Sequence, residues 1–190
     1  MKQVLVILSI LMMLSACDFS VSKQAKNNAD NEIAEIAETD NRQFLVEIGD
    51  LAPDFTMEMP DGSSVQLSDL RGKVVMLQFT TSWCGVCRRE MPHIEEQIWQ
   101  VHKDHPNFAL FGIDREEPAD KIKMMREATG VTYPIGMDLD GSIFGLYAEK
   151  DAGITRNIII DRDGKIVMLT RLFNEEEFKE MVDLIGSMLN

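Results

Sequence analysis

The fold of this chain is decided by residues 79–92, which read FTTSWCGVCRREMP. An apolar run at 74–79 stops at a polar turn, and Cys84 and Cys87 follow where a helix is expected to begin. A thiol at a helix N-terminus faces unpaired backbone N–H groups and the positive end of the helix dipole, and both favour the thiolate. A second thiol one turn later can displace a mixed disulfide. The stretch therefore predicts dithiol–disulfide exchange, with Cys84 as the nucleophile and Cys87 as the resolving cysteine.

The composition narrows the class of protein. The chain has 190 residues, of which 45% are hydrophobic, and this suits one domain with additional segments. Its formal net charge of −13 argues against a nucleic-acid partner, because phosphate binding needs clustered Lys and Arg. The two cysteines, His102 and His105 imitate the spacing of a zinc site, but one helix would separate Cys87 from His102 by roughly 22 Å. We therefore expect no metal and no cofactor beyond the redox pair.

The N-terminus has the pattern of a bacterial export signal. A short positive start is followed by an apolar run at 4–14, which is too short to span a membrane and suits the core of a signal peptide. The run ends in Leu14-Ser15-Ala16-Cys17, which resembles the lipobox of bacterial lipoproteins. We expect a lipoprotein signal peptide at 1–16, lipid attachment at Cys17, and a membrane-anchored protein on the periplasmic side of the cell envelope. The alternative is an ordinary secretory signal beside a cysteine.

A polar segment separates this signal from the domain. Residues 17–48 are rich in Asn, Asp, Glu, Lys, Ser and Ala and contain few aromatic residues, so they cannot bury enough apolar surface to order themselves. We interpret 17–48 as a flexible tether and 49–190 as the folded domain.

Residues 49–190 alternate between strand and helix patterns. We expect strands at 55–59, 65–67, 74–79, 108–113, 153–160 and 165–172, and helices at 84–103, 118–129, 142–148 and after the capping residue Asn174. Pro92 lies inside the first helix and predicts a kink there. A strand, a helix and a strand in succession predict a parallel crossover, so the fold class is α/β.

Four short motifs carry a resemblance to a known family. The motifs are Ala52-Pro53-Asp54-Phe55, Gly72-Lys73-Val74-Val75, Trp83-Cys84-x-x-Cys87 and Ile160-Asp161-x-x-Gly164-Lys165-Ile166. By these motifs the chain resembles, over residues 49–190, the thioredoxin-fold thiol-disulfide oxidoreductases of the TlpA/ResA branch, which are related to the redoxin and AhpC/TSA group. The resemblance implies a central mixed sheet flanked by helices, with an N-terminal β extension and a helical insertion at 118–129.

The same resemblance implies partners. They are protein disulfides or dithiols, among exported or cytochrome-maturation proteins, and a membrane thiol-electron donor that recharges the pair. We expect a monomer that acts as a disulfide reductase and uses Trp83, Ile154, Thr155 and Arg156 to bind substrate.

The sequence departs from the family's pattern at three places. Gln78 stands where thioredoxins carry a buried acid, so the proton of Cys87 must pass to water, to the substrate or to another carboxylate, with Glu90 as a candidate. Gly85 and Val86 between the cysteines include no proline. Thr155 aligns with the family's cis-proline, and without proline a cis peptide bond is not expected there.

Two other functions compete with disulfide exchange. Thr81, three residues before Cys84, and Arg156 match features of peroxiredoxins, which predicts a thiol peroxidase as the alternative, although Leu77 replaces a proline of that motif. A binding module with a structural disulfide is the second alternative, but so small a disulfide loop contributes little to stability.

Overall fold

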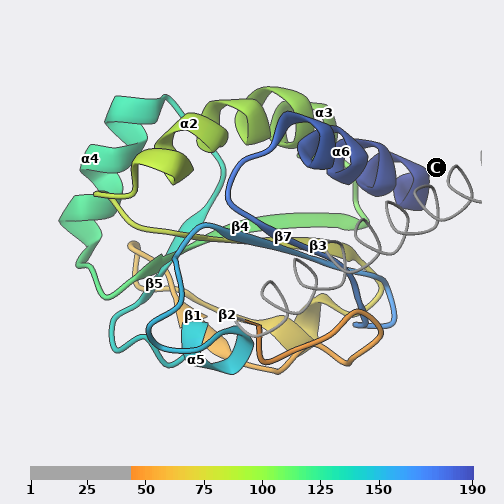
Figure 1. The fold of residues 1–190 in the computed structure, drawn as a ribbon, viewed down its shortest axis with the longest axis horizontal. Helices are drawn as coiled ribbons and strands as arrows, with labels where there is room; N and C mark the ends of the chain where they lie inside the picture. The colour runs from red at the N-terminus through yellow and green to blue at the C-terminus, as the bar shows by residue number, and fades with distance from the viewer. Residues whose placement is uncertain (1–43) are drawn as a thin grey trace, which may run out of the picture. The chain divides into compact units, whose positions relative to one another are not determined.

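The computed structural model describes residues 44–190, which build one seven-stranded sheet with the strand order β2-β1-β5-β4-β3-β6-β7 (Figure 1). The strands are β1 (Thr56–Glu58), β2 (Ser64–Gln66), β3 (Val74–Thr80), β4 (Phe108–Arg115), β5 (Ile135–Asp138), β6 (Arg156–Ile160) and β7 (Ile166–Arg171). β4 runs parallel to β3 and β5, and the remaining pairs are antiparallel. This mixed α/β sheet confirms the predicted fold class, and β1 and β2 form the expected N-terminal extension.

β3 lies inside the sheet between β4 and β6, and all seven of its residues are buried. Its near-continuous apolar sequence is typical of a strand covered on both faces. The chain leaves β3, forms a helix and returns in parallel as β4, with Val74 opposite Phe108 and Thr80 opposite Asp114. The predicted parallel crossover is therefore confirmed.

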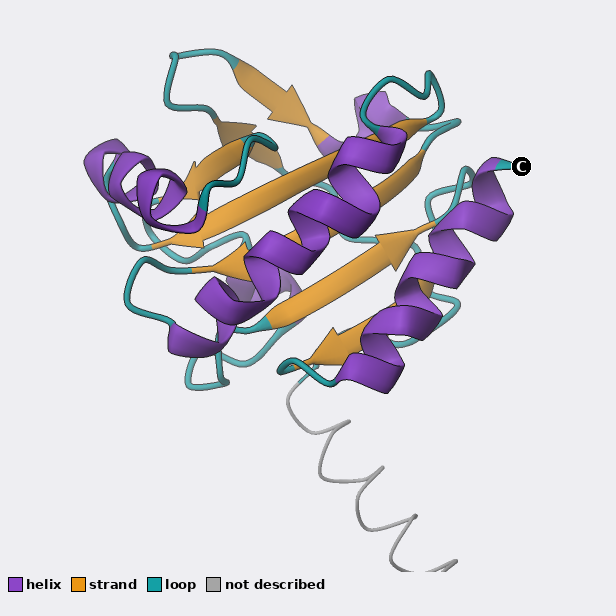
Figure 2. Ribbon diagram, turned by 90° about the horizontal axis from the view of Figure 1, so that it is seen from above, coloured by secondary structure: helices purple, strands orange, loops and turns teal. Residues whose placement is uncertain are grey.

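Helices cover the two faces of the sheet unequally. The helices α2 (Gly85–Ile94), α3 (Gln100–His102), α4 (Ala119–Thr129) and α6 (Glu175–Leu189) lie on one face, and the short α5 (Phe144–Tyr147) lies on the other (Figures 1 and 2). We call the first the helical layer and the second the α5 layer. Each holds its own apolar core: Met91, Ile98 and Ile122 belong to the helical layer, and Phe79 and Phe144 to the α5 layer.

The helix after Cys84 is less regular than a single helix over 84–103. Pro92 lies inside α2, but the irregular part begins later, as a π-helical segment at Glu95–Trp99. Proline cannot donate the N–H that its turn requires, and the N–H of Glu95 is shared between the carbonyl oxygens of Met91 and Pro92. The irregularity near Pro92 is thus a wider, π-helical turn that starts three residues after the proline.

The folded domain begins earlier than the predicted boundary between 48 and 49. Phe44 forms a β-bridge with Ala148, the N–H of Leu45 donates to the carbonyl oxygen of Tyr147 at 2.9 Å, and Val46 is 5% exposed. These contacts assign the last residues of the predicted tether to the domain. The predicted signal peptide at 1–16, the lipid site Cys17 and the rest of the tether lie outside the described residues. Within 44–190, no helix is both long enough and apolar enough to cross a membrane.

Candidate active site

The two cysteines lie at the junction of β3 and α2 and form a disulfide. Cys84 is the N-cap residue of α2, and the N–H of Cys87 donates to Cys84 Sγ at 3.1 Å. Cys84 is 6% exposed, whereas Cys87 is fully buried. The N-terminus of α2, with its free N–H groups and the positive end of its dipole, lies at Cys84, as the sequence predicts. Of the two cysteines, Cys84 alone has surface that solvent can reach.

Thr155 lies directly against both sulfur atoms. Its Oγ1 is 3.2 Å from Cys84 Sγ and 3.3 Å from Cys87 Sγ, and the residue is 3% exposed. The described residues contain no cis peptide bond, so the backbone at Thr155 is trans, as the sequence predicts. A hydroxyl group here can donate to a thiolate of either cysteine, which a proline cannot do.

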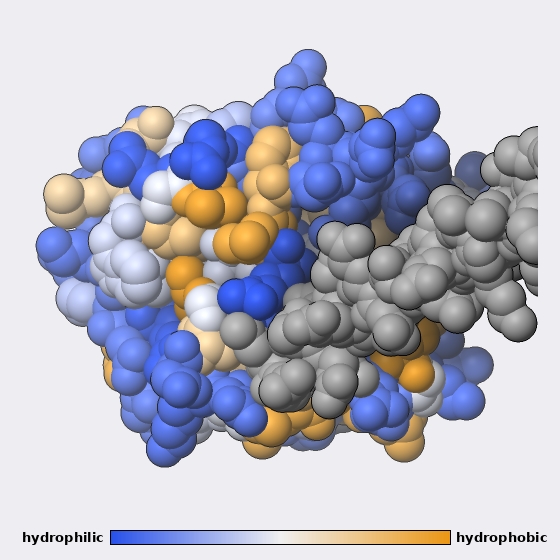
Figure 3. All heavy atoms as spheres, in the orientation of Figure 1, coloured by the Kyte–Doolittle hydropathy of each residue, from blue (hydrophilic) through white to orange (hydrophobic). Residues whose placement is uncertain are grey.

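The predicted substrate-binding residues border the disulfide on one side. Trp83 is 71% exposed, and with Ile154 it lines a pocket of about 380 Å³ that also includes Thr81 and Arg115. The N–H of Leu172, an exposed residue, donates to the carbonyl oxygen of Thr155 at 3.1 Å. Figure 3 shows hydrophobic atoms gathered over α2 and the segment between β7 and α6, on a face that is otherwise largely hydrophilic. The disulfide is therefore bordered by apolar surface.

Arg156 is placed differently from the other predicted residues. It is fully buried in β6, its guanidinium lies 4.2 Å from the ring centre of Phe44, and its Nε donates to the carbonyl oxygen of Gly153 at 3.0 Å. Because neighbouring side chains of a strand point to opposite faces, Arg156 points away from Thr155 and into the α5 layer. Its contacts fix the start of the domain against β6.

A buried polar network lies beneath the cysteines, in the helical layer. Glu90 Oε1 accepts from Asn157 Nδ2 at 2.7 Å, and its Oε2 accepts from Gln78 Nε2 at 3.3 Å. Gln78 Oε1 in turn accepts from the hydroxyl group of Tyr133 at 2.6 Å, and Asn157 also donates to Thr170. Gln78 therefore has a structural role, and its amide group cannot accept a proton as an acid at this position would. It links Tyr133 to the carboxyl group that lies nearest to Cys87 along α2.

Glu90 is an acid with a shifted pKa. It is 1% exposed and lies one turn after Cys87 on the buried face of α2. Burial raises the pKa of Glu90 to about 7, the amides of Asn157 and Gln78 oppose that rise, and the charge of Glu177 adds to it. At neutral pH the carboxyl group can thus either hold or accept a proton.

Glu90 and Asn157 are the network residues that sequence reasoning undervalued. In the sequence, each of them is a polar residue at a position where the surrounding pattern is apolar. Glu90 belongs to the stripe of α2 that contains Cys87, Met91 and Ile94, and Asn157 precedes three consecutive isoleucines of β6. A charged or amide side chain at such a position needs buried partners, and that requirement marks it for attention.

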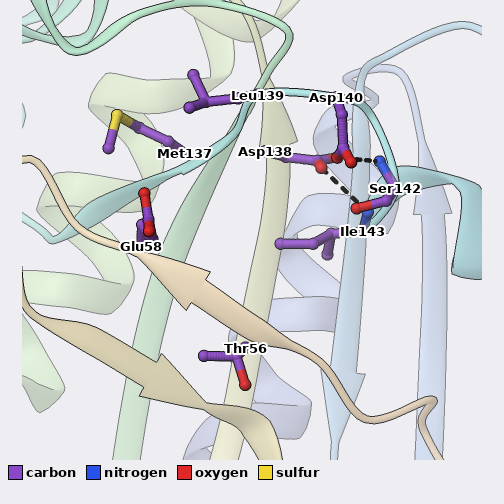
Figure 4. Close-up of a pocket in the computed structure, with 8 residues that line it drawn as sticks. All are labelled: Thr56, Glu58, Met137, Asp138, Leu139, Asp140, Ser142 and Ile143. Atoms are coloured by element: carbon purple, nitrogen blue, oxygen red, sulfur yellow. Dashed lines mark hydrogen bonds between the residues drawn. The ribbon is translucent and has the colours of Figure 1, made fainter.

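A second pocket lies at the end of β5, beside β1 (Figure 4). Asp138 is 2% exposed there, and its carboxylate accepts from the N–H groups of Ile143 and Phe144 at 3.0 and 2.8 Å. Asp140 accepts from the N–H of Ser142 at 3.0 Å. These carboxylates stabilise the loop and the start of α5. Nowhere in 44–190 do three or more His, Cys, Asp or Glu side chains form a group that could hold a metal ion.

Comparison with known proteins agrees with this geometry. The AhpC/TSA family model matches residues 48–169. The thiol-disulfide oxidoreductase ResA of Geobacillus thermodenitrificans is 29% identical over 141 residues, which cover 74% of this chain and 79% of that protein. ResA of Bacillus anthracis is 30% identical over 122 residues, or 64% of this chain and 68% of that protein.

Two solved structures share the fold. The solution structure of a candidate protein disulfide isomerase from Bacteroides thetaiotaomicron is 61% identical with a TM-score of 0.76, and the match covers 77% of this chain and 92% of that one. The crystal structure of a candidate thiol:disulfide interchange protein DsbE from Chlorobium tepidum is 25% identical with a TM-score of 0.64, over 76% and 99% of the two chains. On these grounds the chain belongs to the AhpC/TSA family and is a thiol-disulfide oxidoreductase that carries a Cys84–Cys87 redox pair.

Proposed function

We propose that the protein is a membrane-anchored disulfide reductase of the cell envelope, in which Cys84 attacks a substrate disulfide and Cys87 completes the exchange. One observation carries the assignment of roles. Cys84 Sγ accepts the N–H of Cys87 at the start of α2 and belongs to the less deeply buried cysteine, which is 6% exposed, whereas Cys87 is fully buried. A sulfur in that position is stabilised as a thiolate and can be reached by a substrate.

The exchange has two steps. In the reduced protein, the Cys84 thiolate attacks one sulfur of the substrate disulfide, forms a mixed disulfide and releases the other substrate sulfur as a thiolate. Cys87, as a thiolate, then attacks Cys84 Sγ, which restores the Cys84–Cys87 disulfide and releases the second substrate thiolate. Two electrons pass from the protein to the substrate. A thiol donor returns them, and the proposed donor is a membrane protein.

Glu90 is the proposed acceptor of the Cys87 proton. Its buried position one turn after Cys87 and its pKa near 7 support this role. When Cys87 loses its proton, the Glu90 carboxylate takes it up, and the amide groups of Gln78 and Asn157 keep the carboxyl group in place. The hydroxyl group of Thr155 is close enough to both sulfurs to stabilise either thiolate.

The apolar surface around the disulfide supports a polypeptide substrate. Trp83 and Leu172 are exposed beside the site, and Ile154 lines the adjoining pocket. Large exposed apolar side chains around a reactive group favour contact with another protein. The proposed substrates are exported or cytochrome-maturation proteins, as the TlpA/ResA resemblance of the sequence implies, and the proposed anchor is a lipid on Cys17.

A trapping experiment tests the roles of the cysteines. The reduced Cys87→Ser variant is mixed with a disulfide-bonded test peptide, and mass spectrometry follows the products. We expect a stable one-to-one mixed disulfide on Cys84, and none with the matched Cys84→Ser variant. A mixed disulfide that forms on Cys87 in the Cys84→Ser protein at a similar rate would contradict the assignment.

The direction and the location have separate tests. A reduction potential near the value of about −270 mV that thioredoxin shows supports a reductase, and one well above about −150 mV would exclude that role. Mass spectrometry of the membrane fraction is expected to find an acylated Cys17 at the N-terminus, and Cys17→Ser is expected to release the protein from the membrane.

The peroxidase alternative is tested with hydrogen peroxide. Thr155 rather than Arg156 lies against the two sulfurs, and Arg156 points into the α5 layer, which favours disulfide exchange. Peroxide turnover far above that of a free thiol would support the alternative.

A further inference from the structure

The loop in front of Cys84 is held by a carboxylate from a distant part of the chain. Ser82 donates twice to Glu117: its hydroxyl group donates to Oε1 at 2.7 Å, and its backbone N–H donates to Oε2 at 2.5 Å. Glu117 lies in the segment between β4 and α4, 35 positions after Ser82. Both oxygens of one carboxylate therefore fix the backbone two residues before the nucleophile.

A second carboxyl group lies behind Glu117. Asp114 is fully buried at the end of β4, opposite Thr80 of β3, and points into the helical layer as Leu110 does. The hydroxyl group of Thr80 contacts the sulfur atoms of two methionines. In the described part of the chain, neither oxygen of Asp114 meets an N–H or O–H donor. The carboxyl group that acts on Asp114 is that of Glu117, which is another acceptor.

Two carboxyl groups can hydrogen-bond to each other only when they share a proton. Burial raises the pKa of Asp114 to about 8, and the charge of Glu117 and the hydrogen bond to it add to that rise. Both oxygens of Glu117 already accept a hydrogen bond from Ser82, whereas neither oxygen of Asp114 has a donor among the described residues. The proton of the pair therefore resides on Asp114 at neutral pH.

We propose that Asp114 is a positioning residue for disulfide exchange: its protonated carboxyl group donates to Glu117 and so fixes the carboxylate that holds Ser82 in front of Cys84. The chain of contacts runs from β4 through Glu117 to the loop that carries the nucleophile. This role rests on exchange by the Cys84–Cys87 pair and not on its direction.

Other charged groups near this point are engaged elsewhere or reach solvent. The guanidinium of Arg115 lies 4.3 Å from the ring centre of Phe144, in the α5 layer. The remaining charged side chains on the elements around Asp114 are bonded to other partners or are at least partly exposed: Arg88, Glu90, Glu116, Asp120, Lys121 and Asp138. Glu117 therefore dominates the electrostatic surroundings of Asp114.

Ionisation of Asp114 breaks this arrangement. Above pH 8 the two carboxylates repel each other, and the hydrogen bond between them is lost. Glu117 then holds Ser82 without support from β4, and a smaller fraction of the Cys84 thiolate is correctly placed for attack. The rate per thiolate is expected to fall above this pH, although the thiolate fraction itself rises.

The test uses the reduced full-length protein and a disulfide-bonded peptide. The second-order rate of exchange is measured from pH 6 to 10 and divided by the fraction of Cys84 thiolate, which its ultraviolet absorbance reports. Asp114→Asn keeps a donor that cannot ionise, and Asp114→Ala removes it. Asp120→Asn is the matched control, because Asp120 is an exposed residue of α4.

At pH 6.5 the exchange rate per Cys84 thiolate of Asp114→Asn is expected to lie within about threefold of that of the unmodified protein. At pH 9.5 it is expected to be about tenfold higher, because the loss of a hydrogen bond to a charged group corresponds to roughly that factor. Asp114→Ala is expected to be about tenfold slower at pH 6.5. If Asp114→Ala does not fold, Glu117→Gln replaces it: its amide group donates to an ionised Asp114, so the loss of rate above pH 8 is expected to disappear.

Two outcomes would overturn the proposal. Parallel pH profiles for the unmodified protein and Asp114→Asn would show that the ionisation of Asp114 does not affect the reaction, and this role alone would fail. An unmodified protein that exchanges no faster than a free thiol would overturn the proposed function together with this role.

Discussion

Glu90→Gln gives the sharpest test of the buried network. The change removes an ionisable group and keeps nearly the same shape, so it separates charge from packing. The pKa of Glu90 is raised from its ordinary value of 4.5 to about 7 by burial. The folded protein therefore keeps a proton that the unfolded chain releases as the pH rises from 4.5 to 7. Stability falls as the pH rises through this window.

The size of the effect follows from linkage. Each pKa unit corresponds to about 1.4 kcal/mol, so ionised Glu90 lowers the stability of the folded protein by about 3 kcal/mol relative to its protonated form. About 2.5 kcal/mol of this is lost between pH 5 and pH 9, because at pH 5 the unfolded chain is already partly ionised. The Glu90→Gln protein has no such loss, because an amide does not titrate in this range. Its stability relative to the unmodified protein is therefore expected to rise by about 2.5 kcal/mol from pH 5 to pH 9.

Urea unfolding of the oxidised proteins, followed by tryptophan fluorescence at pH 5, 7 and 9, measures the difference. Asp114 titrates in both proteins, so its contribution cancels in the comparison. Glu96→Gln, the same change at an exposed position of the following π-helical segment, is the control and is expected to show a nearly constant difference. A difference between Glu90→Gln and the unmodified protein that stays within about 0.5 kcal/mol over this range would refute a titrating Glu90.

Three further changes test packing, buried hydrogen bonding and helix capping in the domain by urea unfolding. Gly136→Ala places a methyl group inside the contact distance of the buried Met57 side chain and is expected to cost about 1–3 kcal/mol; an unchanged stability would mean that Met57 moves away freely. Tyr133→Phe removes the hydroxyl group that donates to the buried Oε1 of Gln78 and is expected to lower the free energy of unfolding by about 1–2 kcal/mol. An unchanged free energy of unfolding would show that this hydrogen bond does not contribute to stability. Asn174→Ala removes the side chain that accepts the first N–H groups of α6 and is expected to lower the stability by about 1 kcal/mol. Asn174→Asp keeps a capping oxygen and is expected to retain the stability of the unmodified protein. Equal losses for both changes would argue against capping.

Local patterns predicted the centre of this fold. The apolar run of β3, the cysteines after it and the apolar spacing of α2 each depend on neighbouring residues only, and these elements lie where the sequence places them. The cap at Asn174 is a similar case, because a capping side chain bonds to residues two and three positions later. The position of the cysteine pair could be predicted because it too depends on neighbouring residues.

The partners of Glu90 could not be predicted in this way. On a helix, Glu90 reads as one charged residue among several, and the groups that bury it come from two strands, 12 and 67 positions away. The start of the domain at Phe44, before the predicted boundary, could not be predicted for the same reason. Phe44 directly follows a polar segment, and the residues that it contacts, among them Arg156 and Ala148, lie far along the chain. Contacts between distant residues decide both features.

The position of β3 has a consequence for amide hydrogen exchange. Hydrogen bonds to β4 on one side and β6 on the other protect its backbone, so its amides exchange with solvent chiefly when the whole sheet opens. The loop from Thr81 to Cys84 continues directly from this strand. Changes in exchange between the oxidised and reduced forms therefore belong to the loop and to α2, and the slow amides of β3 provide an internal reference for measuring them.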